Sequence, residues 1–195
     1  MTTRRPVLGG IYPPITTPFA TDGTLALDRL GENIRKYNQT RLAGYVVVGS
    51  TGESVYLREE EKLRVWEAAR AAADSSKLLI AGTGLEATAE TIALTRRAAD
   101  LGYCLALVKT PYYFKPQMSE AVLERHFVAI ADASPIPILI YSVPQFTGLA
   151  VETPLVVRLA EHPNIIGIKE SSGNVERVAQ MIAATPTGFS VLIGS

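Results

Sequence analysis

The sequence predicts an α/β protein with the architecture of a TIM barrel, the (β/α)8 fold. Short apolar runs rich in β-branched residues alternate with segments of helical periodicity, at a spacing of roughly thirty residues that is typical of βαβ units in a parallel sheet. Polar and aromatic residues cluster directly after these runs, where barrel enzymes build their active sites. A doubly wound sheet shares the alternation, but no glycine fingerprint of a dinucleotide site follows the first run. We therefore expect the barrel.

The apolar runs are the predicted strands, and they cover residues 9–19, 44–49, 78–84, 105–109, 137–144, 165–169 and 189–195. The first run is broken by prolines and followed by a turn at Asp22-Gly23. The later ones are almost continuously apolar, as expected of strands that are buried on both faces.

Apolar residues at helical spacing predict helices over residues 25–37, 59–73 and about 88–100, with three more that begin near residues 119, 153 and 174. Thr88, Ser119 and Asn174 are candidate N-caps. Thr153 is a further candidate because proline follows it, at a position favourable for the first helical residue. Trp66 is assigned to the core rather than to a ligand site.

About seven strands are one fewer than a closed barrel needs. We therefore expect a (β/α)8 barrel that is truncated after about the seventh strand, with the C-terminal end of the barrel missing. A fragment, or closure by another chain, would explain open sheet edges that are otherwise a liability. No linker or change of composition divides the chain, so residues 1–195 are expected to form a single domain.

The composition excludes several classes of function. Lys plus Arg and Asp plus Glu number 19 each, so the formal net charge is zero and offers no attraction for nucleic acid or an anionic membrane. A single cysteine, Cys104, fits a reducing cytoplasm, and no long apolar segment predicts a membrane span. Two histidines without a cysteine cluster argue against zinc, so neither a metal nor another cofactor is expected.

One predicted strand, Ile165-Ile166-Gly167-Ile168, ends in Lys169. A lysine that closes a buried strand either extends to solvent or sits in a cavity, where its charge is costly. In the cavity the amine loses its proton more readily and can attack a carbonyl to form a Schiff base. The alternative is a strand-end lysine that pairs with solvent or with Glu170.

Candidate partners for Lys169 follow the other strands. Gly49-Ser50-Thr51-Gly52-Glu53 is a small-residue turn whose backbone N–H groups could hold a carboxylate, or which could simply cap the next helix. Tyr141 and Tyr113 could transfer protons, or could be ordinary tyrosines of the core. Together with a strand-end lysine they form a plausible proton-transfer site without a metal.

Several motifs in this order resemble the pyruvate-dependent, Schiff-base aldolases of the dihydrodipicolinate synthase and N-acetylneuraminate lyase superfamily. The motifs are Pro13-Pro14-Ile15-Thr16-Thr17-Pro18-Phe19, Gly49-Ser50-Thr51-Gly52-Glu53, Thr110-Pro111-Tyr112-Tyr113, Tyr141-Ser142-Val143-Pro144 with Thr147-Gly148, and Gly167-Ile168-Lys169-Glu170. The resemblance runs from Gly10 to Ser195. It implies a TIM-barrel lyase or synthase that forms a homodimer or homotetramer, whereas the cytoplasmic location is expected from the composition alone.

The resemblance also implies roles for individual residues. Lys169 forms the imine with pyruvate or another 2-oxo acid, Tyr141 moves protons to and from it, and Ser50 relays them. Tyr113 completes the relay by reaching into the site of the neighbouring subunit. The substrate-binding residues are Thr51, Gly49, Ser171 and Gly194, with Thr51 holding the pyruvate carboxylate. The second reactant is an aldehyde.

Two departures bear on the subfamily. Phe146 occupies the position of the arginine that holds the aldehyde's carboxylate in dihydrodipicolinate synthases, and Ser142 replaces the usual asparagine. The sequence around Ser134-Pro135-Ile136-Pro137 and His162-Pro163-Asn164-Ile165 looks like the 4-hydroxy-2-oxoglutarate aldolases, which release pyruvate and glyoxylate.

We therefore expect that aldolase activity first. The alternatives are synthesis of 4-hydroxy-tetrahydrodipicolinate from pyruvate and aspartate semialdehyde, another 2-oxo acid or sugar acid aldolase, and a non-catalytic 2-oxo acid binding protein or inactive fragment. A metal-dependent aldolase is disfavoured because no histidine cluster follows the strands.

Overall fold

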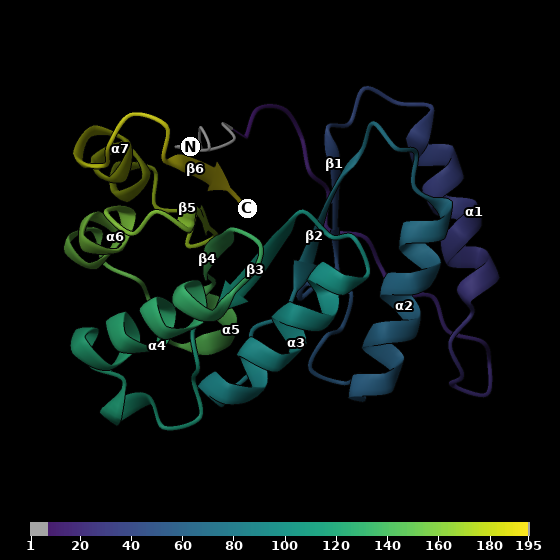
Figure 1. The fold of residues 1–195 in the computed structure, drawn as a ribbon, viewed down its shortest axis with the longest axis horizontal. Helices are drawn as coiled ribbons and strands as arrows, with labels where there is room; N and C mark the ends of the chain where they lie inside the picture. Colours follow the sequence, from purple (N-terminus) through teal and green to yellow (C-terminus); the bar gives the residue numbers. More distant parts are fainter. Residues whose placement is uncertain (1–7, 195) are drawn as a thin grey trace.

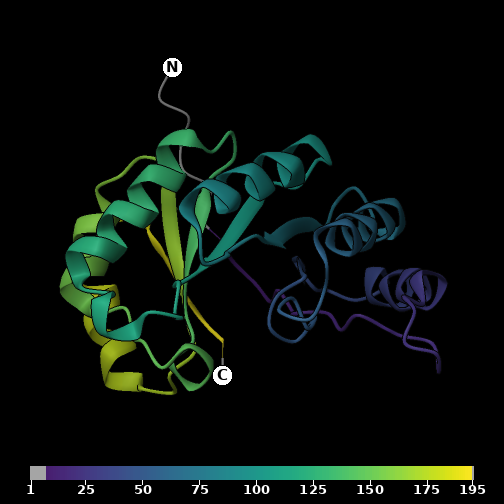
Figure 2. The same cartoon turned by 90° about the horizontal axis from the view of Figure 1, so that it is seen from below.

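The computed structural model describes residues 8–194, which form a curved parallel sheet with helices packed along one side of it (Figures 1 and 2). The six strands of this sheet stand in sequence order and are β1 (Gly44–Val47), β2 (Leu78–Gly82), β3 (Leu105–Lys109), β4 (Ile138–Ser142), β5 (Ile165–Glu170) and β6 (Ser190–Ile193). All five pairings are parallel. This is the strand order of a (β/α) barrel, and it excludes the doubly wound alternative, whose strand order reverses.

The helices that connect the strands pack side by side in chain order. They are α1 (Leu27–Asn38), α2 (Glu59–Ala72), α3 (Thr88–Asp100), α4 (Glu120–Ala133), α5 (Pro144–Thr147), α6 (Thr153–Ala160) and α7 (Val175–Ala184), with a short 3₁₀ turn η1 (Lys115–Gln117) before α4. Contacts join α1 with α2, α3 with α4, and α6 with α7. None of the helices in the described part of the chain is long and apolar enough to span a bilayer.

The two faces of the sheet bury different sets of side chains. Val108, Ile140 and Ile168 belong to a core cluster with the buried residues of α4 and α6, so they face the helices. Leu107 and Leu139 belong to a separate cluster, with Tyr141, on the concave face. Alternate residues of a strand point to opposite faces, so the residues at the carboxyl ends of the strands are divided in the same way.

The first predicted strand, residues 9–19, is the one that the structure does not include in the sheet. It runs beside β1, where the Ile15 N–H donates to the Val46 carbonyl and the Val46 N–H to the Pro13 carbonyl, both at 3.0 Å, but only an isolated bridge forms. Pro13 and Pro14 have no N–H group and cannot continue a ladder. The segment is therefore an irregular neighbour of β1. Ser195, the last residue of the seventh predicted strand, lies outside the described residues.

The predicted helix starts are confirmed at two of four positions. Ser119 and Asn174 cap α4 and α7 by accepting from the backbone N–H groups of Val122 and Arg177. Thr88 and Thr153 are instead the first residues inside their helices, and neither caps with its side chain. Trp66 is fully buried in the core, as predicted.

The pairing of β4 with β5 contains a β-bulge. Ile138 pairs with Ile165, but Leu139 pairs with Gly167, so one extra residue of β5 lies between the two pairs. Ile165 and Ile168 face the helices, whereas Ile166 lies in the concave cluster. Gly167 fits because a Cβ there would collide with the Ser190 carbonyl oxygen and would lie 3.0 Å from a methyl group of Leu139.

Backbone strain is concentrated where β1 ends. Val48 has φ +59°, a left-handed conformation that costs a β-branched residue about 1–3 kcal/mol. The Val48 carbonyl lies directly against Gly82 of β2, and a Cβ at residue 82 would lie only 2.7 Å from the Val48 carbonyl carbon. Gly82 therefore leaves the room that the turn after Val48 requires.

We predict that Gly82→Ala lowers the free energy of unfolding by about 2–4 kcal/mol, because backbone atoms cannot move away from the added methyl group cheaply. Chemical denaturation measures the change. Gly9→Ala is the matched control, since a Cβ at residue 9 would meet nothing within 4 Å. Equal stability of the two variants would show that the turn after Val48 relaxes easily.

Candidate active site

Three polar side chains lie at one level of the sheet, at the carboxyl ends of neighbouring strands. Lys109 of β3 pairs with Tyr141 of β4, and Tyr141 pairs with Lys169 of β5. Paired residues of parallel strands point to the same face, and Tyr141 belongs to the concave cluster. The register therefore directs both lysines and the tyrosine toward the concave side.

Lys169, Tyr141 and Ser50 form a connected group at this level. The Lys169 Nζ lies 4.5 Å from the centre of the Tyr141 ring, within the range of a cation–π contact. The Ser50 hydroxyl donates a long hydrogen bond of 3.4 Å to the Tyr141 hydroxyl oxygen, which is longer than usual for two hydroxyls. Tyr141 is only 6% exposed. The amine, the phenol and the serine that the sequence singled out are thus brought together.

The strained turn after β1 holds Ser50 in place. The Gly52 N–H donates to the Gly49 carbonyl at 3.0 Å, and Thr17 from the segment beside β1 donates to the Gly52 carbonyl at 2.7 Å. Gly49 is buried and lines a small cavity with Ser50 and Tyr141. Strain that is held this firmly beside polar side chains is common at functional sites.

Ser171 and Gly194 lie against Lys169. The Ser171 N–H donates to the Ser142 carbonyl at 2.9 Å, and the Gly194 N–H donates to the Glu170 carbonyl at 2.9 Å. A Cβ at residue 194 would overlap the Ser171 hydroxyl and lie 2.6 Å from the Lys169 Cε. The backbone at Gly194 therefore packs on the stem of Lys169.

The concave face of the sheet borders a cavity of about 470 Å³ that Lys169 lines. Gly194 and Leu192 line it beside Lys169, and the other lining residues come from the inner positions of the strands and from residues 10–14. A small molecule in this space can reach the amine of Lys169.

Within the described part of the chain, the side chains of Thr51 and Tyr113 are not part of the group that Lys169, Tyr141 and Ser50 form. Thr51 is exposed, and its hydroxyl makes no hydrogen bond to another described residue. Tyr113 is 75% exposed and packs edge-on against Phe114. Its position is fixed through its backbone N–H, which donates to Glu86 at 2.9 Å.

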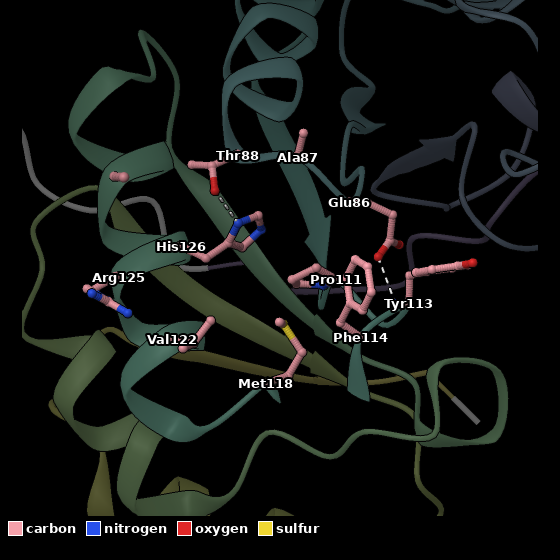
Figure 3. Close-up of a pocket in the computed structure, with 11 residues that line it drawn as sticks. Glu86, Ala87, Thr88, Pro111, Tyr113, Phe114, Met118, Val122, Arg125 and His126 are labelled. Atoms are coloured by element: carbon pink, nitrogen blue, oxygen red, sulfur yellow. Dashed lines mark hydrogen bonds between the residues drawn. The ribbon is translucent and has the colours of Figure 1, made fainter. Parts of the chain in front are cut away.

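Tyr113 lines a separate cavity of about 530 Å³ between the start of α3 and helix α4 (Figure 3). His126 of α4 lies in its wall, 2.8 Å from the Thr88 hydroxyl through Nδ1. Burial lowers the pKa of His126 to about 4, and the nearby charge of Lys109 adds to the effect. The imidazole is therefore neutral at pH 7.

Sequence reasoning missed two residues beside the site, Lys109 and Glu86. The Lys109 Nζ lies 3.4 Å from Glu86 and 4.7 Å from the centre of the Tyr112 ring. Burial lowers the pKa of Lys109, while Glu86 opposes that change. The signal was available, because Lys109 closes an apolar strand in the same way as Lys169.

The group can perform nucleophilic and acid–base chemistry. An amine, a phenol and a hydroxyl in sequence suit attack on a carbonyl followed by proton transfer. Among residues 8–194, no group of three or more His, Cys, Asp or Glu side chains could hold a metal ion.

Comparison with known proteins identifies relatives over nearly the whole chain. Residues 7–195 match the Dihydrodipicolinate synthetase family. The chain is 41% identical over 186 residues to the 4-hydroxy-tetrahydrodipicolinate synthase of Exiguobacterium sp., and 43% identical over 187 residues to that of Xanthomonas axonopodis pv. citri. These matches cover 95% and 96% of this chain, but it spans only 63% and 61% of the length of the two relatives.

Solved structures agree with the sheet topology. The 4-hydroxy-tetrahydrodipicolinate synthase of Methylacidiphilum fumariolicum SolV superposes with a TM-score of 0.91 at 37% identity, over 96% of this chain and 62% of that one. The dihydrodipicolinate synthase of Acinetobacter baumannii complexed with pyruvate gives 0.90 at 38% identity, over 95% and 63%. The sheet is thus the matching part of a TIM barrel, as predicted.

We predict that Gly194→Ala displaces the Lys169 side chain without unfolding the protein, because the added methyl group meets flexible side-chain atoms. The rate of reductive methylation of Lys169, followed by peptide mass spectrometry, should change severalfold. Gly9→Ala serves as the control. An unchanged rate would show that Gly194 does not position the lysine.

Proposed function

This chain belongs to the dihydrodipicolinate synthetase family, and from that premise we propose that it acts on pyruvate as a class I aldolase through a Schiff base on Lys169. The single observation that carries the proposal is the group at the carboxyl ends of the strands, with the Lys169 amine over the Tyr141 ring and the Ser50 hydroxyl on the Tyr141 oxygen. The pyruvate in the complex of the Acinetobacter relative supports the choice of substrate.

The chemistry follows from the order of these groups. The amine of Lys169 attacks the ketone carbon of pyruvate, and water leaves as the imine forms. The protonated imine withdraws electrons, so the adjacent methyl group can lose a proton to give an enamine. The enamine carbon then forms a bond to an aldehyde, or the reverse sequence breaks that bond. Finally, water hydrolyses the imine and releases Lys169.

Tyr141 and Ser50 are the proposed proton carriers. Tyr141 is close to the amine and buried, so its hydroxyl can transfer protons to and from the imine without competition from bulk water. Ser50 extends the path by its hydrogen bond to Tyr141. Gly49, Thr51, Ser171 and Gly194 are the proposed substrate-binding residues. The pyruvate carboxylate is expected at the turn that contains Gly49 and Thr51, where backbone N–H groups can bind an anion.

The first candidate for the overall reaction is synthesis of 4-hydroxy-tetrahydrodipicolinate, the activity for which the two curated relatives are named. It joins pyruvate to aspartate semialdehyde. The comparisons thus favour this alternative over the 4-hydroxy-2-oxoglutarate aldolase that the motifs led us to expect first.

Cleavage of 4-hydroxy-2-oxoglutarate remains the second candidate because of one specific observation. Phe146, at the position of the synthases' arginine, is 68% exposed and lines a cavity of about 240 Å³ that also contains Ser50. A phenyl ring cannot bind the carboxylate of aspartate semialdehyde as the arginine does. Assays of both reactions with the same preparation distinguish the two candidates.

We predict that borohydride added with pyruvate leaves a pyruvate-derived adduct on Lys169, identified by intact mass and peptide mapping. Lys169→Met should abolish the adduct, and Tyr141→Phe should slow its formation by about 10²-fold, the usual worth of a positioned acid or base. Lys62→Met, which removes a different buried lysine, should leave the adduct intact. A folded protein that forms no adduct would favour a non-catalytic 2-oxo acid binding protein or an inactive fragment.

We propose further that Tyr113 completes the proton path of a neighbouring subunit in a homodimer or homotetramer. The support is its exposure, together with that of Phe114, which is 63% exposed. Tyr113→Phe should lower turnover by about tenfold or more without changing the free energy of unfolding, because the hydroxyl makes no hydrogen bond to a described residue. Tyr37→Phe, at a tyrosine of helix α1 that is 37% exposed, is the control. Equal turnover in both variants would remove Tyr113 from the mechanism.

A further inference from the structure

Lys109 is a second lysine at the level of Lys169, and the mechanism above does not use it. It pairs with Tyr141 from the side opposite to Lys169, so Tyr141 separates the two amines. Alternation along β3 places Lys109 on the same face as Leu105 and Leu107, which both belong to the concave cluster. Lys109 is thus directed to the mouth of the same site.

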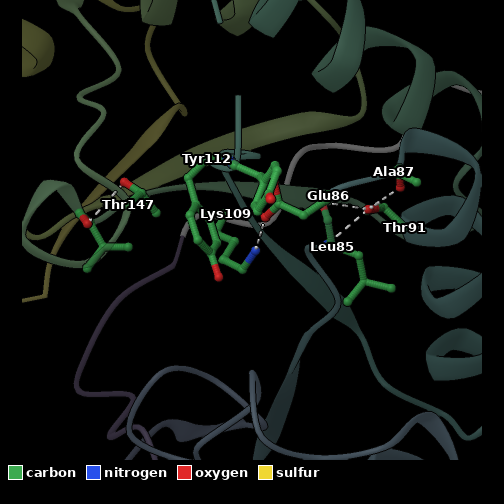
Figure 4. A network of polar contacts seen from close by, with 9 residues as sticks. Leu85, Glu86, Ala87, Thr91, Lys109, Tyr112 and Thr147 are labelled. Carbon is green, nitrogen blue, oxygen red and sulfur yellow. Dashed lines mark hydrogen bonds and ion pairs between the residues drawn. The ribbon is translucent and has the colours of Figure 1, made fainter. Parts of the chain in front are cut away.

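The side chain of Lys109 is held in place and largely removed from water. It is 13% exposed, and a Cβ at residue 84 would lie only 2.9 Å from its Cγ, so the backbone at Gly84 packs on its stem. The ammonium group lies beside Glu86 and over the ring of Tyr112 (Figure 4). A cation fixed in this way loses little conformational entropy when it binds an anion.

Glu86 only partly neutralises this cation. Its other oxygen, Oε2, accepts the backbone N–H groups of Tyr112 and Tyr113 at 2.8 and 2.9 Å, so its negative charge is shared among three donors. The 3.4 Å separation from Lys109 exceeds the 2.7–2.9 Å that is usual for a strong charged hydrogen bond. Burial and the charge of Lys62 both lower the pKa of Lys109. A second anion near Lys109 would therefore be stabilising.

The cavity of about 240 Å³ is where such an anion can bind. It is lined by Ser50, Ser54, Val55, Tyr56, Lys109, Tyr112, Val143, Phe146 and Thr147, and Lys109 is the only charged residue among them. Ser50 connects the cavity to Tyr141 and thus to the reacting atoms. Phe146 supplies part of the wall but no cation.

We propose that Lys109 binds the carboxylate of the second reactant, an aldehyde that carries an acid group, in the cavity between Ser50 and Phe146. This inference rests on the proposed function, since it assigns the position of the aldehyde relative to the imine. Glyoxylate and aspartate semialdehyde both carry this carboxylate. Lys109 is then a specificity-determining residue that selects acidic aldehydes over uncharged ones.

The competing interpretation is that Lys109 only anchors the loop that contains Tyr112 and Tyr113 through Glu86. The two interpretations make opposite predictions for Glu86→Gln, which keeps an oxygen for the backbone N–H groups but removes the negative charge. If Lys109 binds a carboxylate, the variant frees the ammonium, and the KM for an acidic aldehyde falls or is unchanged. If Lys109 is an anchor, Glu86→Gln lowers kcat with every aldehyde, as the loss of Lys109 would.

The experiment compares the unmodified chain, Lys109→Met, Glu86→Gln and the control Lys36→Met, at an exposed lysine of α1, with pyruvate and three aldehydes: glyoxylate, aspartate semialdehyde and uncharged acetaldehyde. Lys109→Met should raise KM for the acidic aldehydes on the order of 10- to 100-fold, the usual effect of losing a charged hydrogen bond, and leave acetaldehyde unchanged. If Lys109→Met raises the KM of only one of the two acidic aldehydes, the carboxylate that Lys109 binds belongs to that aldehyde. An equal effect on all three aldehydes overturns the proposal.

A binding measurement separates this proposal from the proposed function. Calorimetric titration with succinate semialdehyde, in the absence of pyruvate, needs no turnover. Loss of binding in Lys109→Met but not in Lys36→Met supports the carboxylate site. It does so even if borohydride leaves no adduct on Lys169, a result that would overturn only the proposed aldolase activity. Equal binding by the unmodified chain and Lys109→Met, or none by either, overturns the role of Lys109.

Discussion

The parallel register of β3, β4 and β5 is the constraint on which the site depends. Because Tyr141 pairs with Lys109 on one side and Lys169 on the other, the backbone hydrogen bonds of the sheet determine which side chains meet. The side chains need no long loops to bring them together. Apolar residues below them keep the register, since a slip by one residue would move every buried side chain to the wrong face.

The strained turn after β1 positions Ser50, the third side chain of the candidate site. Val48 adopts a conformation that valine avoids, and Gly82 on the neighbouring strand is the residue that makes room for it. The chain turns sharply there, and Ser50 arrives beside Tyr141. The rigid sheet thus carries the amine and the phenol, whereas a strained turn, held by Thr17 from outside the sheet, carries the hydroxyl.

Much of this arrangement could be predicted from the sequence, because the strands are short apolar runs whose ends coincide with polar residues. Lys169, Tyr141 and Ser50 were identified in this way, and the structure brings them together. Residues 9–19 are less predictable, since their apolar character indicates a strand while Pro13 and Pro14 lack the N–H groups that a strand needs.

The surroundings of the site could not be predicted, because they depend on contacts between distant segments. Thr88 has the composition of an N-cap, yet its hydroxyl bonds to His126, 38 residues away. Glu86 holds the loop of Tyr112 and Tyr113 by accepting hydrogen bonds from their backbone N–H groups, which lie far from it in the sequence. Lys109 closes an apolar strand as Lys169 does, but no motif in the sequence distinguishes it.

The β-bulge in β5 determines the face of the sheet on which Lys169 lies. With strict alternation from Ile165, which faces the helices, residue 169 would face the helices as well. The extra residue at Ile166-Gly167 reverses the parity, and Lys169 comes to share the concave face with Tyr141. A single extra residue therefore decides whether Lys169 lies on the concave face of the sheet or on the face that packs against the helices. Gly167 lies within this bulge, where a Cβ would collide with the Ser190 carbonyl oxygen.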